Sequence, residues 1–309
     1  MNFRYLRYFA GVAEKLSFSR AAETLNVSQS ALSRQIQLLE SDLGVKLFDR
    51  IGRRVALTPA GRELLQRCHA ILHDVESLQA KATQLAGGLG GVLRIGATPQ
   101  TLESLVSRFL PRYRRKHPNV EVVLTEDGSA RLAQEVENGH LNMAVGALTS
   151  TSALSGRMLF PLAALAIVPT GHRLKGKASI EISELAGEPL LLLAPQFMTR
   201  QLFDGACQIS NLQPRVLIES ASPHCLLSLV AVQHGIAIIP STVLLDKLQP
   251  NAIPLTHNGK TLGFWMSAIW DPRRHISAQA EAFIDELFAA TRDNYPGKAF
   301  NLTGVAQRA

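Results

Sequence analysis

The sequence is poor in the residues that build disulfide frameworks, metal centres and membrane spans. It contains three cysteines, Cys68, Cys207 and Cys225, which form neither an even disulfide set nor a metal-binding spacing. No run of about 18 apolar residues could span a membrane, and the start Met1-Asn2-Phe3-Arg4 lacks the apolar core of a signal peptide. These absences predict a protein of the reducing cytoplasm that holds no metal and no other cofactor.

Motifs of the common enzyme classes are also missing. There is no Gly-x-Ser-x-Gly elbow, His-Glu-x-x-His zinc site, phosphate-binding loop or dinucleotide fingerprint, and the histidines are scattered. His172 is interpreted as a structural loop residue. For Cys207 and Cys225, buried structural thiols are favoured over the alternative of a redox switch. The protein is therefore not expected to be an enzyme.

The composition is that of a soluble chain with two or three domains. The 309 residues are 46% hydrophobic and 18% charged, which allows sizeable cores. Residues 1–86 contain 12 Lys and Arg against 8 Asp and Glu, whereas residues 87–309 contain 20 against 17. The excess of positive charge per residue is therefore higher near the N-terminus. A positive charge is what a polyanionic partner such as a nucleic acid requires.

The stretch from Ser17 to Glu40 predicts two short helices joined by a tight turn. Ser17 and Ser28 are placed to cap them, and Asn26 tolerates the left-handed conformation that the turn needs. The outer face of the second helix carries polar side chains and no acid before Glu40, which suits the DNA major groove. A solvated helical hairpin is the alternative. The predicted DNA-binding residues of this helix are Ser28, Gln29, Ser30, Ser33, Arg34 and Gln37.

The segment after this helix predicts a β-wing. Two short apolar runs flank a turn at Gly52, with Arg50, Arg53 and Arg54 at the tip. Arginines on such a tip can contact phosphates or enter a narrow minor groove, and Thr58 is expected to hold the DNA backbone beside them. An ordinary solvent-exposed hairpin is the alternative.

A long helix is expected over residues 59–86. Thr58-Pro59 is a strong helix start, and 28 residues at 1.5 Å each give about 42 Å. Apolar residues step by four and three along it, which is the seam of a coiled coil between two copies. Packing on the chain's own domains is the alternative. The predicted dimer seam consists of Leu64, Cys68, Ile71, Val75, Leu78, Ala82 and Leu85.

Residues 1–60 closely resemble the winged helix-turn-helix of LysR-type transcriptional regulators. Ser30 is a small departure, since many members carry proline there. The length, the linker helix and the trailing sensor also match, so the resemblance covers nearly the whole chain. The strings that carry it are Leu6-Arg7-Tyr8-Phe9, Ser17-Phe18-Ser19-Arg20-Ala21-Ala22, Leu25-Asn26-Val27-Ser28-Gln29-Ser30-Ala31-Leu32-Ser33-Arg34-Gln35-Ile36, Leu39-Glu40, Leu43-Gly44-Val45-Lys46-Leu47-Phe48-Asp49-Arg50 and Leu57-Thr58-Pro59-Ala60-Gly61.

Beyond a glycine-rich hinge at residues 87–91, strands and helices alternate in two blocks. This pattern indicates an α/β domain with parallel sheets. The resemblance implies a two-lobed, periplasmic-binding-protein-like sensor behind an all-α, winged head. The expected boundaries are a head over 1–58, a linker helix over 59–86, a first lobe over 92–162 and 268–294, a second lobe over 163–267, and a flexible tail over 295–309.

Ligands of open α/β sheets bind beyond the carboxyl ends of strands, where helices begin. Four such junctions carry polar side chains, and helix N-termini there favour a carboxylate or another anion. In chain order they are Thr98–Thr101, Gly128-Ser129, Pro195–Arg200 and Ser220–His224. The resemblance places effectors at the first and third junctions. Each hydroxyl could instead be a simple helix cap. The predicted effector-binding residues are Thr98, Gln100, Thr101, Ser129, Gln196, Phe197, Met198, Thr199, Arg200, Ser220 and His224.

Taken with the resemblance, these patterns predict a regulator that binds promoter DNA as a dimer or tetramer and responds to a small-molecule effector. RNA polymerase is a further candidate partner. The alternatives from other classes are a two-lobed solute-binding protein and an α/β enzyme with an accessory helical head. The missing signal peptide weighs against the first, and the missing catalytic motifs weigh against the second.

Overall fold

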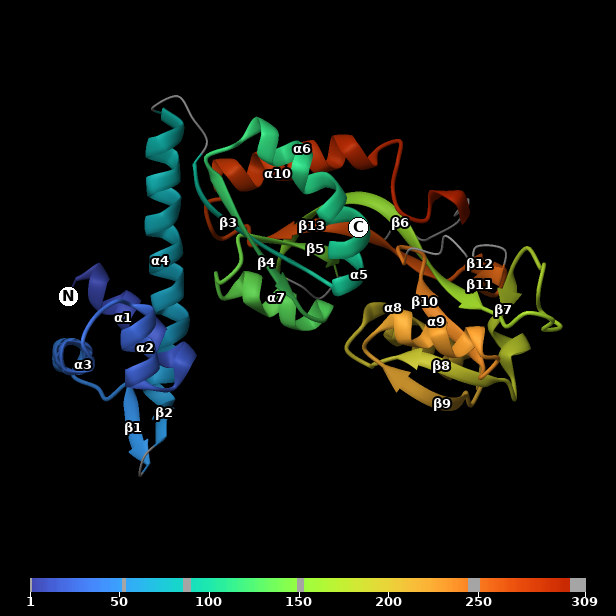
Figure 1. Cartoon of the computed structure of the whole chain (residues 1–309), viewed down its shortest axis with the longest axis horizontal. Helices are drawn as coiled ribbons and strands as arrows, with labels where there is room; N and C mark the ends of the chain where they lie inside the picture. The colour runs from blue at the N-terminus through green and yellow to red at the C-terminus, as the bar shows by residue number, and fades with distance from the viewer. Residues whose placement is uncertain (1, 52–53, 86–89, 149–152, 244–250, 301–309) are drawn as a thin grey trace. The chain divides into compact units, whose positions relative to one another are not determined.

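The computed structural model describes residues 2–51, 54–85, 90–148, 153–243 and 251–300. The chain divides into two compact units (Figure 1). One unit comprises Met1–Gly88 with Glu137–His140, and the other comprises Leu89–Val136 with Leu141–Ala309. Among the helices described, none is both long and apolar enough to cross a membrane.

The head is a three-helix cluster followed by a two-stranded wing. The Phe48 ring meets Phe9 and Phe18 edge-on, with centroids 5.5 and 5.8 Å away, so the first wing strand is joined to the helical core. Such pairs add about 0.5–1.5 kcal/mol each beyond the burial of their area. The elements of the head are α1 (Phe3–Lys15), α2 (Phe18–Thr24), α3 (Gln29–Leu43), β1 (Phe48–Ile51) and β2 (Arg54–Leu57).

Helix α4 (Pro59–Leu85) follows the wing directly. Gly61 lies against the Leu47 backbone, where an added Cβ would come within 2.1 Å of the carbonyl oxygen, so only glycine fits at this crossing. Of the predicted seam, Leu64 and Cys68 already pack against the core of the head. Ile71 and Leu78 are exposed, Leu78 by 70%. The Leu85 side chain lies outside the described part, and the seam as a whole stays a prediction.

The sensor contains two parallel-stranded sheets joined by long antiparallel strands. The strand order is β4-β3-β5-β13-β6-β10-β8-β9, in which β3 is parallel to β4 and β5, and β8 is parallel to β10 and β9. These strands are β3 (Gly91–Ala97), β4 (Val120–Glu126), β5 (Met143–Ala147), β6 (Ser155–Ile167), β8 (Pro189–Leu193), β9 (Arg215–Ser220), β10 (Ile236–Pro240) and β13 (Gly263–Trp270).

Strand β6 is the first crossing between the lobes. Its residues up to Ala163 pair with β13, and its residues from Ala164 pair with β10. The predicted end of the first lobe at residue 162 therefore agrees with the pairing to within one residue. The return boundary needs correction: β13 already pairs with β6 of the first lobe from Gly263, so the second lobe ends near residue 262 rather than 267.

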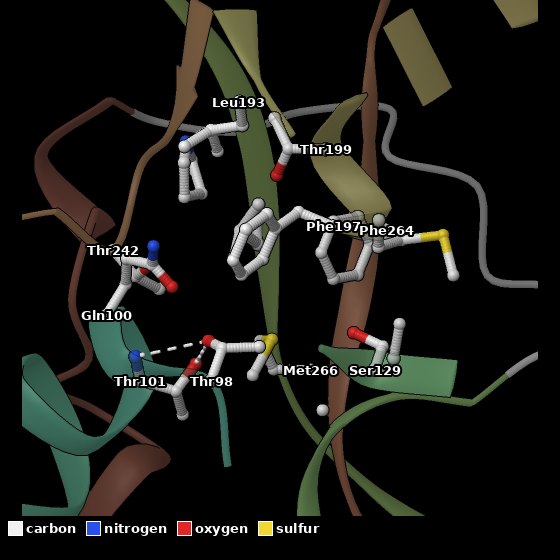
Figure 2. A pocket seen from close by; sticks show the side chains of 15 residues that line it. Thr98, Gln100, Thr101, Ser129, Leu193, Phe197, Thr199, Thr242, Phe264 and Met266 are labelled. Atoms are coloured by element: carbon white, nitrogen blue, oxygen red, sulfur yellow. Dashed lines mark hydrogen bonds between the residues drawn. The ribbon is translucent and has the colours of Figure 1, made fainter. Parts of the chain in front are cut away.

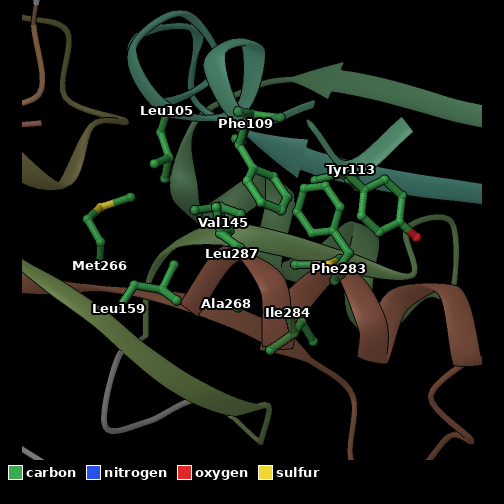
Figure 3. Close-up of a cluster of buried hydrophobic side chains, with 14 of the residues drawn as sticks. Leu105, Phe109, Tyr113, Val145, Leu159, Met266, Ala268, Phe283, Ile284 and Leu287 are labelled. Carbon is green, nitrogen blue, oxygen red and sulfur yellow. The ribbon is translucent and has the colours of Figure 1, made fainter. Parts of the chain in front are cut away.

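Helices cover both faces of the first-lobe sheet. Helices α6 (Ser107–Lys116) and α10 (Ala278–Thr291) lie on one face, with α7 (Ser129–Glu137) on the other (Figure 1). Phe109 and Tyr113 from α6 interlock with Phe283 from α10, each at a ring-centroid distance of 5.0 Å (Figure 3). Before α6, the three-residue α5 (Pro99–Thr101) leads into a π-helical turn, η1 (Leu102–Val106).

The second lobe has a core on each face of its sheet. Its helices are α8 (Met198–Ile209) and α9 (Pro223–Ala231), and its further elements are β7 (Ile180–Glu181), η2 (Ile182–Leu185), β11 (Ala252–His257) and β12 (Lys260–Thr261). Strand β11 was not predicted from the sequence. It pairs antiparallel with β6, adjacent to the lobe crossing.

The start of the predicted flexible tail is packed. The Tyr295 ring stacks on Phe160 at a centroid distance of 5.0 Å, and Phe300, in η4 (Lys298–Phe300), packs against the second-lobe core. Residues 295–300 therefore join both lobes through their apolar side chains. The sequence pattern had grouped these residues with a polar tail. Residues 301–309 of that predicted tail lie outside the described part of the chain.

Candidate nucleic-acid interface and effector cavity

The second helix of the predicted helix-turn-helix is α3, and its ends are fixed by local chemistry. The Ser28 hydroxyl accepts a hydrogen bond from the Ala31 N–H at 3.2 Å, and Gly44 ends the helix with a φ of 70°. Asn26 adopts the left-handed conformation expected for the turn, with a φ of 53°. Local residue chemistry therefore positions this helix across α2, as the sequence predicts.

Helix α3 has a buried apolar face and an outer polar face. Leu32, Ile36 and Leu39 are buried in the head. Of the six predicted DNA-binding residues on this helix and its cap, five are exposed and Ser33 is half-buried. Glu40, the acid of α3 nearest to this face, is buried and accepts hydrogen bonds from the Leu47 and Phe48 N–H groups. Its charge is therefore taken up inside the head and does not face outward.

The wing contains most of the remaining predicted DNA contacts. Arg50 and Arg54 lie on β1 and β2, but their side chains, and all of Arg53, are outside the described part of the chain. Thr58 is a correction to the prediction. Its side chain is buried, donates to the Lys46 carbonyl at 2.7 Å and accepts from the Gly61 N–H at 2.8 Å. It caps α4 from within the head and has no hydroxyl left for DNA.

A cavity lies where the two lobes face each other, and seven predicted effector residues line it: Thr98, Gln100, Thr101, Ser129, Phe197, Met198 and Thr199 (Figure 2). They come from the first and third predicted junctions and from the start of α7. The structure therefore brings these residues to one place, and their contact with an effector remains a prediction.

Among the described residues, the cavity wall contains no charged side chain but does offer unused donors. Gln100 is 4% exposed, and its Nε2 group has no hydrogen-bond partner among the described residues. Helix α8 begins at the same wall, and its N-cap residue, Phe197, has no side-chain atom that could accept from the first N–H groups. By contrast, Thr98 accepts from the Thr101 N–H at 3.4 Å.

Four predicted effector residues lie outside the cavity wall. Arg200 is held by Asp204 and by Glu219, with its Nη1 and the Glu219 carboxylate 2.5 Å apart. Burial lowers the pKa of Arg200, but hydrogen bonds to both carboxylates outweigh it and raise the pKa overall. Ser220 accepts from the Ser222 N–H, His224 contacts Glu103, and Gln196 lies against Gly128. These four side chains do not line the cavity in this structure, and their contact with an effector remains a prediction.

Several lining residues were missed by the sequence interpretation. They belong to strands or strand ends far apart in the chain, where an alternating apolar pattern cannot tell core from cavity: Gly146, Ala147, Leu162, Leu193, Pro240, Thr242, Phe264 and Met266. Only Thr242, which follows β10 in the same way that Thr98 follows β3, carried a usable signal. It is a hydroxyl at the carboxyl end of a strand.

The cavity is narrow in this structure. Its volume is about 30 Å³, room for one or two water molecules and not for an organic effector. Two contacts join the lobes beside it. His224 Nε2 lies 3.0 Å from a Glu103 carboxylate oxygen, and Gly128 lies so close to Gln196 that an added Cβ would be 3.0 Å from its side chain. An effector can enter only if these contacts separate or the lining side chains move.

Of the two cysteines interpreted as buried structural thiols, one needs correction: Cys225 is exposed. Cys207 is buried in the second-lobe core, and burial, assisted by the Asp204 carboxylate, raises the pKa of its thiol to about 11. A thiol in this state is a poor redox centre at neutral pH. Within the described ranges, no group of three or more His, Cys, Asp or Glu side chains is arranged to hold a metal ion.

A chain that combines a winged helix-turn-helix with a two-lobed sensor and a cavity between its lobes has the architecture of a ligand-responsive DNA-binding protein. Comparison with known families agrees. Residues 3–62 match the family described as bacterial regulatory helix-turn-helix protein, lysR family, and residues 86–292 match the LysR substrate binding domain.

Similar proteins extend this match to the whole chain. An uncharacterized HTH-type transcriptional regulator of Escherichia coli K12, YnfL, is 31% identical to this chain. The alignment covers 94% of this chain and 99% of the length of YnfL. The DNA-binding transcriptional dual regulator OxyR of the same organism is 31% identical, in an alignment that covers 78% of this chain and 79% of the length of OxyR. A full-length OxyR variant from Pseudomonas aeruginosa superposes with a TM-score of 0.74 at 25% identity, covering 95% of both chains.

The chain therefore belongs to the LysR family of transcriptional regulators. It carries the family's DNA-binding head and its effector-binding sensor. The resemblance seen in the sequence is confirmed, and this assignment supports a regulator over a solute-binding protein or an enzyme with an accessory head.

Proposed function

We propose that this chain is a cytoplasmic, non-enzymatic regulator that reads an inverted repeat through α3 and responds to a small carboxylate with an apolar body. The outward face of α3 supports the first part. Gln29, Ser33 and Arg34 lie on or beside this face, the nearby acid is buried, and side chains of these types pair with base edges in the major groove.

The chemistry of the cavity supports the choice of effector. A carboxylate would accept from the buried, unpaired Gln100 Nε2 and from the free N–H groups at the start of α8. Phe197, Phe264 and Met266 provide an apolar wall for the rest of the molecule. Gln100 carries this proposal, because a buried donor without a partner loses about 1–3 kcal/mol that an acceptor on the ligand would restore.

The exposed side of α4 supports self-association. Ile71 and Leu78 lie seven residues apart on one side of the helix, and burying them against a second copy would remove apolar surface from water. Two heads joined in this way would contact half-sites about one helical turn of DNA, or a multiple of it, apart.

The test is the affinity of Arg34→Ala for duplex DNA from upstream of the chain's own gene, measured by fluorescence anisotropy against a scrambled duplex. If Arg34 pairs with a guanine, the specific complex should weaken by about 1–3 kcal/mol, roughly 5- to 150-fold, while the scrambled duplex changes little. Arg67→Ala, which removes an exposed arginine from α4, is the charge-matched control. Equal losses on both duplexes would reject base recognition by Arg34, and no binding to any duplex by the unaltered protein would reject the proposed function.

A further inference from the structure

A second and larger cavity lies on the first lobe. It is a groove of about 290 Å³ between α6, the C-terminal end of α10 and residues 294–296. The effector cavity measures about 30 Å³ by comparison. The groove therefore has room for a small organic molecule without any movement of the lobes.

The groove has an unneutralised cationic wall. Arg108 and Arg112 lie one turn apart on α6, both are exposed, and both line the groove, whose lining contains no Asp or Glu. Within the described part of the chain, neither has a carboxylate partner. Other arginines of the sensor do: Arg157 pairs with Asp285, and Arg173 pairs with Glu188. Two arginine side chains at this spacing can bind one carboxylate through charge-assisted hydrogen bonds.

The remaining surface of the groove is largely apolar. Leu105 from η1, Phe109 from α6 and Leu287 from α10 form its floor, and all three belong to the core of the lobe (Figure 3). Tyr295 lies at one side, held in place by its stack on Phe160. A ligand that fits must therefore combine an anionic group with an aromatic or short alkyl body.

We propose that this groove is a second small-molecule site, for an amphipathic carboxylate bound between Arg108 and Arg112 and the floor formed by Phe109 and Leu287. A ligand in this groove would affect the effector cavity, because one hydrogen bond links the two. Ser104 lines the groove and donates to the Gln100 carbonyl at 2.7 Å, and the Gln100 side chain lines the effector cavity. The proposal does not depend on DNA binding or on the effector proposed above.

The experiment is a calorimetric titration of the full-length protein with 3-phenylpropionate, using the uncharged 3-phenylpropan-1-ol as the matched ligand. We expect saturable binding of the acid and at least about tenfold weaker binding of the alcohol, because the alcohol lacks the charge that the arginines pair with. Arg108→Gln with Arg112→Gln should weaken binding of the acid to a similar extent.

Three variants locate the bound acid. Arg114→Gln with Arg115→Gln removes two exposed arginines of the same helix that do not line the groove, and should bind normally. Ala290→Leu, which fills the groove without changing charge, should abolish binding. Gln100→Leu should leave it intact.

Several results would overturn the second site. The first is the absence of saturable binding, and the second is equal binding of the acid and the alcohol. The third is loss of binding in Gln100→Leu while the Arg108 and Arg112 variant still binds, which would place the acid in the effector cavity. Sedimentation provides the remaining check. If the Arg108 and Arg112 variant changes the oligomeric state, the groove is a contact between copies of the chain.

Discussion

The DNA-facing surface of the head and the effector cavity of the sensor use polar side chains in opposite ways. On α3 the polar groups are exposed and ready for a partner, and Glu40 is hydrogen-bonded inside. In the sensor they line a cavity of about 30 Å³, and Gln100 carries a buried donor without a described partner. The polar face of α3 is already exposed to a partner, whereas the cavity must widen before an organic molecule can enter it.

The largest expected effect separates the buried from the exposed face of α3. Leu32→Ala removes a fully buried side chain from the head and should lower the free energy of unfolding by about 2–5 kcal/mol. Leu38→Ala, on the same helix but 42% exposed, is the control and should change stability by less than about 0.5 kcal/mol. Urea unfolding followed by circular dichroism measures both. Equal losses would mean that Leu38 is buried in the assembled protein.

An intermediate effect contrasts two polar residues of the effector cavity. Gln100→Leu removes the unpaired donor, so the effector-free protein should keep its stability or gain up to about 1 kcal/mol. Thr101→Val removes a hydroxyl that lies 3.0 Å from the Thr98 hydroxyl and should lose about 1 kcal/mol. Both values come from urea unfolding of the full chain. A clear loss of stability in Gln100→Leu would show that this amide is satisfied in solution, and would remove the main support for the carboxylate.

These expectations depend on features that the sequence reveals unequally. The head could be predicted almost completely, because its caps, turn and apolar stripes involve residues within a few positions of each other, such as Ser28 with Ala31. The cavity could be predicted only in part. Its strand-end hydroxyls carry a local signal, but Met266 enters the wall through the pairing of β13 with β5 and β6, which no local pattern encodes. The contact of His224 with Glu103 could not be predicted, because the two residues lie 121 positions apart in sequence.

The smallest expected effect concerns that ion pair across the lobes. His224 and Glu103 are each about half exposed, so solvent should limit their coupling to less than about 1 kcal/mol. A double-mutant cycle with Glu103→Gln and His224→Gln, followed by thermal unfolding, measures it. The pair Arg157 and Asp285, which lies within one lobe, is the reference. A coupling energy well above this limit would mean that the pair is shielded from water in the oligomer, and that it alone could hold the lobes together.

The π-helical turn at Leu102–Val106 bears on how this sensor could acquire a new specificity. A π turn holds one residue more than the regular winding around it, and here it separates Thr98–Thr101 at the cavity from Phe109 and Tyr113 in the core. Deleting a single residue within the turn would restore α-helical winding. Because the wider turn absorbs the extra residue, the cavity residues and the packed aromatic residues would stay on nearly the same faces of the helix. An insertion or deletion at this one point could thus change the side chains beside the cavity without refolding the lobe.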